Sequence, residues 1–184
     1  MIAFYVLLAL AAALLLWAVL IYNGLVRMRS MVQEAWSGID VQLKRRTDLI
    51  PNLVATVKGY AEHEKGTLEE VIRLRGLAQN AQGVGETAQA QGLLGAALGK
   101  LFALAESYPD LKANANFAQL QASLGEIEEQ IQLARRYYNG AVRNLNIAVE
   151  SFPSNLIAGR FGFEKAEFFE LESPAERAVP KVEF

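Results

Sequence analysis

The residue types that carry catalysis or bind metals are sparse in this sequence. It has one histidine, His63, and no cysteine, which excludes a disulfide framework, a thiolate nucleophile and cysteine-based metal sites. His63 lies between Glu62 and Glu64. Consecutive side chains of a helix point in different directions around its axis, so these three do not converge on one ion. A solvated histidine is therefore the favoured interpretation.

A group of carboxylates, Glu126, Glu128 and Glu129, has a spacing that could in principle hold a cation. A four-helix di-iron site would also need Glu-x-x-His motifs or a second carboxylate cluster, and the sequence has neither. No set of nucleophile, base and oxyanion donors can be assembled from the other residues. We therefore expect no enzymatic activity, no metal, no cofactor and no small-molecule substrate. The net charge of −2 also argues against a nucleic-acid partner.

One polar segment stands out as a partner-binding or structural motif. Its singled-out residues are Trp36, Asp40, Arg45, Arg46, Asp48, Pro51 and Asn52. The basic run 44–46 with Asp48 could contact lipid, but a solvated helix face is the favoured interpretation. Asp48 precedes Pro51 by three residues, a spacing typical of a helix cap followed by a first turn. We therefore expect a kink or a new helix at this point.

An apolar segment at the N-terminus determines where the rest of the chain is held in the cell. Residues 2–22 carry no charge, and at about 1.5 Å per residue they span about 32 Å, enough to cross a bilayer. A cleaved signal peptide would need a basic residue before a shorter apolar run and a small-residue cleavage site after it. No Lys or Arg precedes this run. The sequence therefore predicts an uncleaved anchor over residues 1–22 that contacts membrane lipids through residues 2–22.

Positive charge follows the anchor rather than preceding it. Arg27 and Arg29 come directly after the apolar run, and Lys44, Arg45 and Arg46 lie further on. Because cytoplasmic flanks of membrane helices are enriched in Lys and Arg, the predicted location is the inner (plasma) membrane. The chain would cross it once, with the N-terminus outside and the C-terminal domain in the cytoplasm.

The remaining chain has an ordinary globular composition and no sustained strand-like alternation, so we interpret it as all-α. The first helix should continue from the anchor to about residue 47. Further expected elements are an amphipathic stretch at about 48–77, a flexible connection at about 79–86, a helix at about 87–107 and a turn at 108–110. Together they indicate an antiparallel bundle of about four long helices.

The clearest helical pattern is a run of apolar residues, spaced alternately by three and four, from Phe117 to Phe152. This repeat predicts coiled-coil-like packing, and Pro153 should end the helix. Four later phenylalanines should dock on the bundle, namely Phe161, Phe163, Phe168 and Phe169. The predicted organisation is an anchor at 1–22, a helical bundle at 23–170 and a disordered tail at 171–184.

These motifs together resemble those of the LemA family. The first block runs from Tyr22 to Val54 and contains Ala35-Trp36-Ser37, Asp40-Val41-Gln42-Leu43 and Asp48-Leu49-Ile50-Pro51-Asn52. Later blocks are Val57-Lys58-Gly59-Tyr60-Ala61, His63-Glu64, Tyr108-Pro109-Asp110-Leu111-Lys112-Ala113-Asn114, Tyr138-Asn139, Phe152-Pro153-Ser154 and Phe161-Gly162-Phe163. One departure is Asn144-Leu145-Asn146, where many members have a tyrosine before the second asparagine.

The resemblance implies a bacterial membrane protein with one N-terminal helix, an extracytoplasmic N-terminus and a cytoplasmic helical bundle. It implies no agreed activity and no catalytic residues. The segment from Asp40 to Asn52 could be a partner surface, or the kink and capping that shape the first hairpin, which we favour. We expect a non-catalytic membrane-anchored scaffold that binds a protein partner or a second copy of itself. The alternative is an accessory regulator of a membrane protease or envelope signalling complex.

Overall fold

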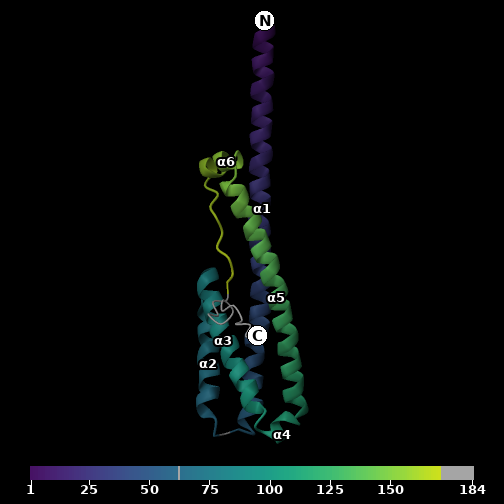
Figure 1. Ribbon diagram of the computed structural model, residues 1–184, viewed down its shortest axis with the longest axis vertical. Coiled ribbons are helices and arrows are strands. Elements are labelled where there is room, and N and C mark those ends of the chain that lie inside the picture. The colour runs from purple at the N-terminus through teal and green to yellow at the C-terminus, as the bar shows by residue number, and fades with distance from the viewer. Residues whose placement is uncertain (62, 171–184) are drawn as a thin grey trace, which may run out of the picture. The chain divides into compact units, whose positions relative to one another are not determined.

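Every regular element in the described part of the chain is an α-helix (Figure 1). The computed structural model describes residues 1–61 and 63–170. Its helices are α1 (Ile2–Lys58), α2 (Lys65–Asn80), α3 (Gly83–Ala105), α4 (Pro109–Lys112), α5 (Ala115–Glu150) and α6 (Ser154–Phe161). The all-α prediction, with four long helices, is confirmed. The predicted disordered tail at 171–184 lies outside the described residues.

The chain divides into two compact units. Unit 1 comprises residues 1–38 and 136–167, and unit 2 comprises residues 39–135 and 168–184. Helices α1 and α5 contribute residues to both units, whereas α2, α3 and α4 belong to unit 2 and α6 belongs to unit 1. The two units are described separately below.

Helix α1 runs without interruption from the apolar N-terminus to Lys58. Its most apolar 18-residue window has a mean hydropathy of 2.7 and is 0% buried, so this part is long and apolar enough to cross a membrane. The new helix predicted near residue 48 is wrong, because α1 continues through this point. Asp48 is an exposed residue within the helix, and Pro51 also lies inside it.

A side chain from α2 explains how α1 continues through Pro51. Proline has no backbone N–H to donate to the carbonyl four residues earlier, which here belongs to Thr47. The Nε of Arg75 donates a hydrogen bond to that carbonyl oxygen at 2.8 Å. Pro51 is exposed, while Ile50 and Leu53 beside it are fully buried. The helix therefore keeps both its apolar contacts and a donor for the carbonyl that proline leaves unpaired.

The later helices differ from the predicted segments mainly at their ends. The stretch predicted at 48–77 is the end of α1 and most of α2, because α1 ends at Lys58 and α2 begins at Lys65. The predicted flexible connection at 79–86 is much shorter, since α3 begins at Gly83, whose φ of +75° suits glycine. The predicted turn at 108–110 instead starts the short helix α4, with Pro109 in its first turn.

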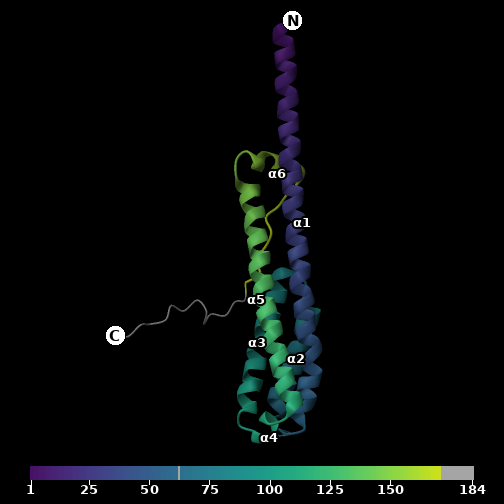
Figure 2. The same cartoon turned by 90° about the vertical axis from the view of Figure 1, so that its right-hand side faces the viewer.

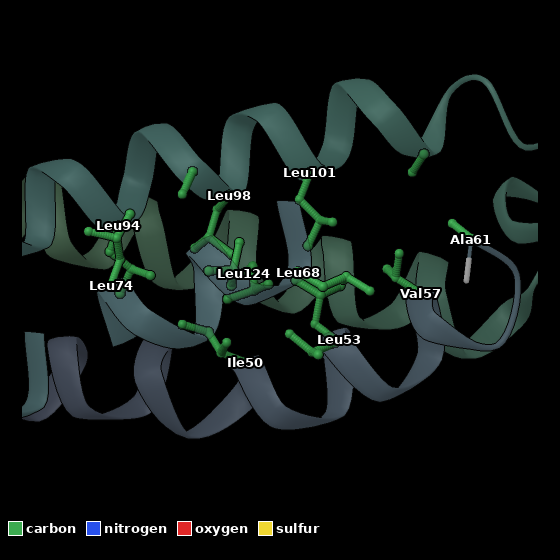
Figure 3. Packing of buried hydrophobic residues seen from close by; sticks show 14 of the residues in the cluster. Ile50, Leu53, Val57, Ala61, Leu68, Leu74, Leu94, Leu98, Leu101 and Leu124 are labelled. Carbon is green, nitrogen blue, oxygen red and sulfur yellow. The ribbon is translucent and has the colours of Figure 1, made fainter. Parts of the chain in front are cut away.

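Unit 2 has a continuous core of branched aliphatic side chains (Figure 3). Helices α1, α2, α3 and α5 all contribute to it. Representative core residues are Ile50, Leu53 and Val57 of α1, Leu68 and Leu74 of α2, Leu94, Leu98 and Leu101 of α3, and Leu124 of α5. Burial of such side chains stabilises the fold by about 1.5–3 kcal/mol each, which compensates for the weak helix formers in α3.

Helix α5 has the 36 residues expected from the apolar repeat. Most residues of the repeat are buried or half-buried: Phe117, Leu120, Leu124, Ile127, Ile131, Ala134, Tyr138, Ala141, Leu145 and Ala148. The exception is Phe152, which is 80% exposed. It lies beyond the end of α5 at Glu150, where the chain has already left the helical path.

In unit 1 the chain returns toward α1 through α6, a helix that the sequence did not predict. Leu25, Ala158 and Phe163 form a small buried cluster there. The ring of Tyr22 lies 5.0 Å from that of Phe161 and 5.6 Å from that of Phe163, both edge-on. Of the four phenylalanines expected to dock, Phe163 and Phe169 are buried, whereas Phe161 and Phe168 are exposed.

Polar side chains of α5 hold the segment that follows α6. Asn146 donates from Nδ2 to the carbonyl of Ala166 at 3.0 Å and accepts from its N–H at 2.8 Å. The hydroxyl of Tyr138 donates to the carbonyl of Glu167 at 2.8 Å. Burial raises the pKa of Tyr138, with Glu167 adding to the effect, so this hydroxyl remains a donor at neutral pH. The segment is thus fixed through its backbone.

Removing the side chain that compensates for the proline should destabilise the protein only while the proline is present. We expect Arg75→Met to lower the free energy of unfolding by about 1–2 kcal/mol. The loss should largely vanish in a Pro51→Ala background, because an alanine there donates its own N–H to Thr47. Urea unfolding of the full chain in detergent micelles, followed by circular dichroism, measures both effects.

The matched control is Arg73→Met. Arg73 is exposed and pairs with Glu70 within one turn of α2, at 2.8 Å, so its loss should lower the free energy of unfolding much less than the loss of Arg75 does. An equal cost of Arg75→Met with and without Pro51 would contradict the proposed compensation.

Candidate functional site

The seven residues singled out in the sequence do not form one site. Trp36 belongs to unit 1, where it is half-buried and its ring centroid lies 5.5 Å from that of Tyr138. The other six belong to unit 2. Five of them are exposed on the surface of α1, namely Asp40, Arg45, Asp48, Pro51 and Asn52. Arg46 alone among the seven is buried, at 5% exposure. The motif therefore separates into exposed positions and two positions engaged with other helices.

Arg46 joins three helices inside unit 2. Its Nη1 donates to Oε2 of Glu128 on α5 at 2.7 Å. Its Nη2 donates to the backbone carbonyl of Gln91 on α3 at 3.0 Å and to Oε1 of the same residue at 2.5 Å. The interpretation of residues 44–46 as a solvated face is thus wrong for Arg46. It fits Lys44 and Arg45, which are exposed.

The contacts of the Arg46 guanidinium only partly offset the free-energy cost of removing this charge from water. Burial lowers its pKa, and the opposing effect of Glu128 is smaller. Its Nε is also buried without a hydrogen-bond partner among the described residues. The side chain stays charged at neutral pH, as arginine does in proteins. A buried charge of this kind is costly unless its partners are well placed, so unit 2 depends on Glu128 and Gln91.

Of the three carboxylates considered for a cation, Glu128 takes a structural role. Glu128 contacts the guanidinium of Arg46 and also accepts a hydrogen bond from Nε2 of Gln132 at 2.9 Å. Glu126 and Glu129 are exposed, as is His63. Among the residues that the structure describes, no cluster of three His, Cys, Asp or Glu side chains could hold a metal ion.

Two of the sequence blocks that resemble the family meet in unit 2. Nδ2 of Asn114 donates to the hydroxyl of Tyr60 at 2.9 Å, and the hydroxyl of Tyr108 donates to Oε1 of Glu64 at 3.1 Å. Oδ1 of Asn114 also accepts from the backbone N–H of Phe117 at 3.0 Å. This is a helix N-cap at the start of α5. These residues connect helices and cap α5. Their structural roles are sufficient to explain why they occur at these positions, and no bound ligand is needed to explain them.

A groove between α3 and α5 of unit 2 includes Arg46 in its lining and has a volume of about 830 Å³. Arg46 and Glu128 lie at its base as an ion pair. Most of its remaining walls are small or uncharged: Ala88, Gln91, Gly92, Leu93, Gly95, Ala96, Gly99 and Phe102 of α3 and Gln121, Leu124, Gly125 and Gln132 of α5. Between residues 87 and 105 the sole charged residue is Lys100.

Three glycines of this groove have no steric role within the chain. A Cβ at Gly99 or Gly125 would meet nothing within 4 Å, and one at Gly95 would lie 3.8 Å from Nη1 of Arg46, an ordinary contact. Glycine inside a helix costs about 0.5–1 kcal/mol relative to alanine. The groove is therefore kept open at the expense of helix stability, which suits the close approach of a group from outside the chain.

Sequence reasoning missed this groove. The sequence signal was the spacing of Gly92, Gly95 and Gly99, which places them on one helix face. From the same residues we predicted only a helix at about 87–107.

The Arg46–Glu128 pair should show strong energetic coupling. Glu128→Ala leaves the buried guanidinium without its counter-charge and should lower the free energy of unfolding by about 2–3 kcal/mol, less than for a wholly buried pair because Glu128 is partly exposed. In an Arg46→Met background the same substitution should cost little, since no buried charge remains. Urea unfolding of the four variants in micelles measures the coupling. Glu129→Ala, an exposed neighbour, is the control and should behave alike in both backgrounds.

Comparison with known proteins places the chain in a family. The family model described as LemA family matches residues 35–184. The chain is 31% identical over 180 residues to "Magnetosome protein MamQ 2" of Paramagnetospirillum magneticum, covering 84% of this chain and 66% of that protein. It is 28% identical over 183 residues to "Magnetosome protein MamQ" of Magnetospirillum gryphiswaldense, with coverage of 84% and 66%.

A further relative is "Protein LemA" of Metamycoplasma hominis, 26% identical over 150 residues, with coverage of 80% of this chain and 68% of that protein. The chain thus spans slightly less than two thirds of the length of the MamQ relatives. The family match covers most of the chain and includes all helices after α1. Together with its apolar N-terminal helix, this match shows that the chain is a membrane-associated helical protein that belongs to the LemA family.

Proposed function

We propose that the chain is a non-catalytic, membrane-anchored scaffold that associates with a second copy of itself through the groove between α3 and α5. The observation that carries this proposal is the groove lined by Gly95, Gly99 and Gly125, none of which is needed for packing within the chain. A mainly apolar recess whose two charged residues are paired with each other can accept the apolar face of a helix. None of the relatives named above is described as an enzyme, which supports a non-catalytic role.

The chemistry of α3 favours a second copy as the occupant. In a twofold dimer identical faces meet, so every charged residue near the axis lies close to its own like charge. The groove avoids this repulsion, because its charges, Arg46 and Glu128, neutralise each other and Lys100 is the sole charge between residues 87 and 105. Leu93 lines the groove and is 49% exposed, so it can enter the groove of the other copy.

Membrane anchoring supports the same conclusion. We propose residues 1–22 as the transmembrane anchor and residues 23–170 as the helical bundle. Anchored copies share one surface, so their effective concentration is high and a modest interface is sufficient. Arg27 and Arg29 follow the anchor directly, which favours an inner-membrane protein with its N-terminus outside and the bundle in the cytoplasm.

Filling the groove should stabilise the chain and weaken its self-association. We expect Gly99→Ala to raise the free energy of unfolding by about 0.5–1 kcal/mol, because alanine favours the helix and its Cβ meets open space. The same methyl group narrows the groove and should raise the dimer dissociation constant, and Gly99→Leu should raise it further. Energy transfer between labelled copies in liposomes measures association, and urea unfolding in micelles measures stability.

Gly76→Ala is the matched control. Gly76 lies in α2, outside the groove, and its Cβ would also meet nothing within 4 Å. It should stabilise the chain equally without changing association. If Gly99→Leu leaves association intact, the copies do not meet at this groove. If the unmodified chain is monomeric in liposomes, self-association is wrong and a helix of another protein becomes the candidate occupant.

The absence of cysteine allows a clean test of orientation. A single cysteine from Phe184→Cys should resist a membrane-impermeant maleimide in intact cells and react after permeabilisation. The reverse labelling pattern would place the bundle outside the cytoplasm.

A further inference from the structure

An exposed apolar cluster lies at the turn between α5 and α6 and along α6. Among the described residues beyond the anchor, the three most exposed large apolar side chains are Phe152, Leu156 and Phe161, at 80%, 62% and 59%. All three fall within ten residues of sequence and within unit 1. Apolar surface concentrated in this way marks a site of interaction with a protein or a membrane.

The cluster lies beside the end of the proposed anchor. The ring of Phe161 is 5.0 Å from that of Tyr22, the last residue of the apolar run. The preceding residues span about 32 Å as a helix, close to the thickness of the hydrocarbon core of a bilayer. Both views show α6 alongside α1, with the N-terminal part of α1 extending beyond it (Figures 1 and 2). If residues 2–22 span the bilayer, α6 lies at the boundary between acyl chains and headgroups.

The two faces of α6 differ in the way that an interfacial helix requires. Ala158 is buried and Ile157 is half-buried against the cluster around Leu25, while Leu156 faces outward. Phe161, the last residue of the helix, packs one side of its ring against Tyr22 and is still 59% exposed. Gly162, with a φ of +69°, ends the helix and reverses the chain. One face is thus fixed to unit 1, and Leu156 on the other face and the exposed part of Phe161 remain available to a lipid surface.

The charges around the cluster suit an anionic membrane surface. Residues 23–29 and 150–165 contain four basic and two acidic side chains. Glu150 is neutralised by Lys165, with Oε1 and Nζ 2.7 Å apart. Arg27 and Arg160 are exposed. Arginine side chains beside an apolar surface can bind lipid phosphates while the apolar groups enter the acyl region.

We infer that residues 152–161 form a second membrane contact, which inserts Phe152, Leu156 and Phe161 into the headgroup region of an anionic bilayer next to the anchor. This inference rests on the proposed membrane-spanning role of residues 2–22. It assigns a lipid surface, rather than a protein, to the exposed side of α6. The contact would add a second point of attachment and restrict how unit 1 tilts at the membrane surface.

Lipid quenching of a fluorescent label tests the inference on the full chain. Single cysteines from Phe152→Cys and Leu156→Cys are labelled with an environment-sensitive fluorophore, and the protein is reconstituted into liposomes of phosphatidylcholine and phosphatidylglycerol. We expect both labels to lose fluorescence to lipids that carry a nitroxide near the headgroup, and less to lipids that carry it deep in the acyl chain. Tyr137→Cys is the matched control, because Tyr137 is a 54% exposed aromatic residue of α5 in the same unit. It should not be quenched.

A second label separates this inference from the anchor proposal. Leu10→Cys lies at the centre of the apolar run and should be quenched by the deep nitroxide. If it is quenched while positions 152 and 156 match the control, the anchor stands and the second contact is wrong. If Leu10→Cys is not quenched, the anchor itself is wrong. A blue-shifted emission at 152 and 156 without lipid quenching would mean that protein covers this surface, which also overturns the inference.

Discussion

The buried guanidinium of Arg46 is the constraint on which unit 2 depends. It brings a positive charge from α1 into the interior, where each unmet hydrogen-bonding group costs about 1–3 kcal/mol. Glu128 of α5 and Gln91 of α3 meet most of that requirement. Because the guanidinium is planar and its donors are fixed, these contacts specify how α3 and α5 are placed along α1. Apolar packing alone would allow neighbouring registers.

The same logic applies where the backbone itself lacks a partner. Arg75 supplies the donor that Pro51 removes from α1, and Asn146 pairs with both backbone groups of Ala166. In each case a polar side chain meets a backbone group that regular secondary structure leaves unpaired. The apolar stripes bring the helices together, and these few polar contacts define their alignment. A helical bundle without catalytic residues can therefore still need particular polar residues at particular positions, because these residues align its helices.

The features predicted correctly from the sequence are those encoded locally. The apolar run at the N-terminus lies within one continuous helix, and the repeat between Phe117 and Ala148 determines α5, because helix periodicity depends on residues a few positions apart. The burial of Arg46 could not be predicted, since its carboxylate partner is 82 residues away. Pro51 was misinterpreted as a break because the compensating donor comes from another helix. The groove was missed because a glycine in a helical segment has the same low helix propensity whether or not it lines a groove. The sequence alone does not distinguish the two cases.

The glycines of α3 have a consequence for motion as well as for shape. With a single charged side chain between residues 87 and 105, this part of α3 lacks the intrahelical ion pairs that support other helices. Its helical state depends on the buried leucines that face the core. Such a helix opens locally at lower free energy than its neighbours, so its amide protons exchange with solvent sooner. A group that fills the groove would slow this exchange. The protein with an occupied groove would then differ from the unoccupied protein in the rigidity of α3 and not in its fold.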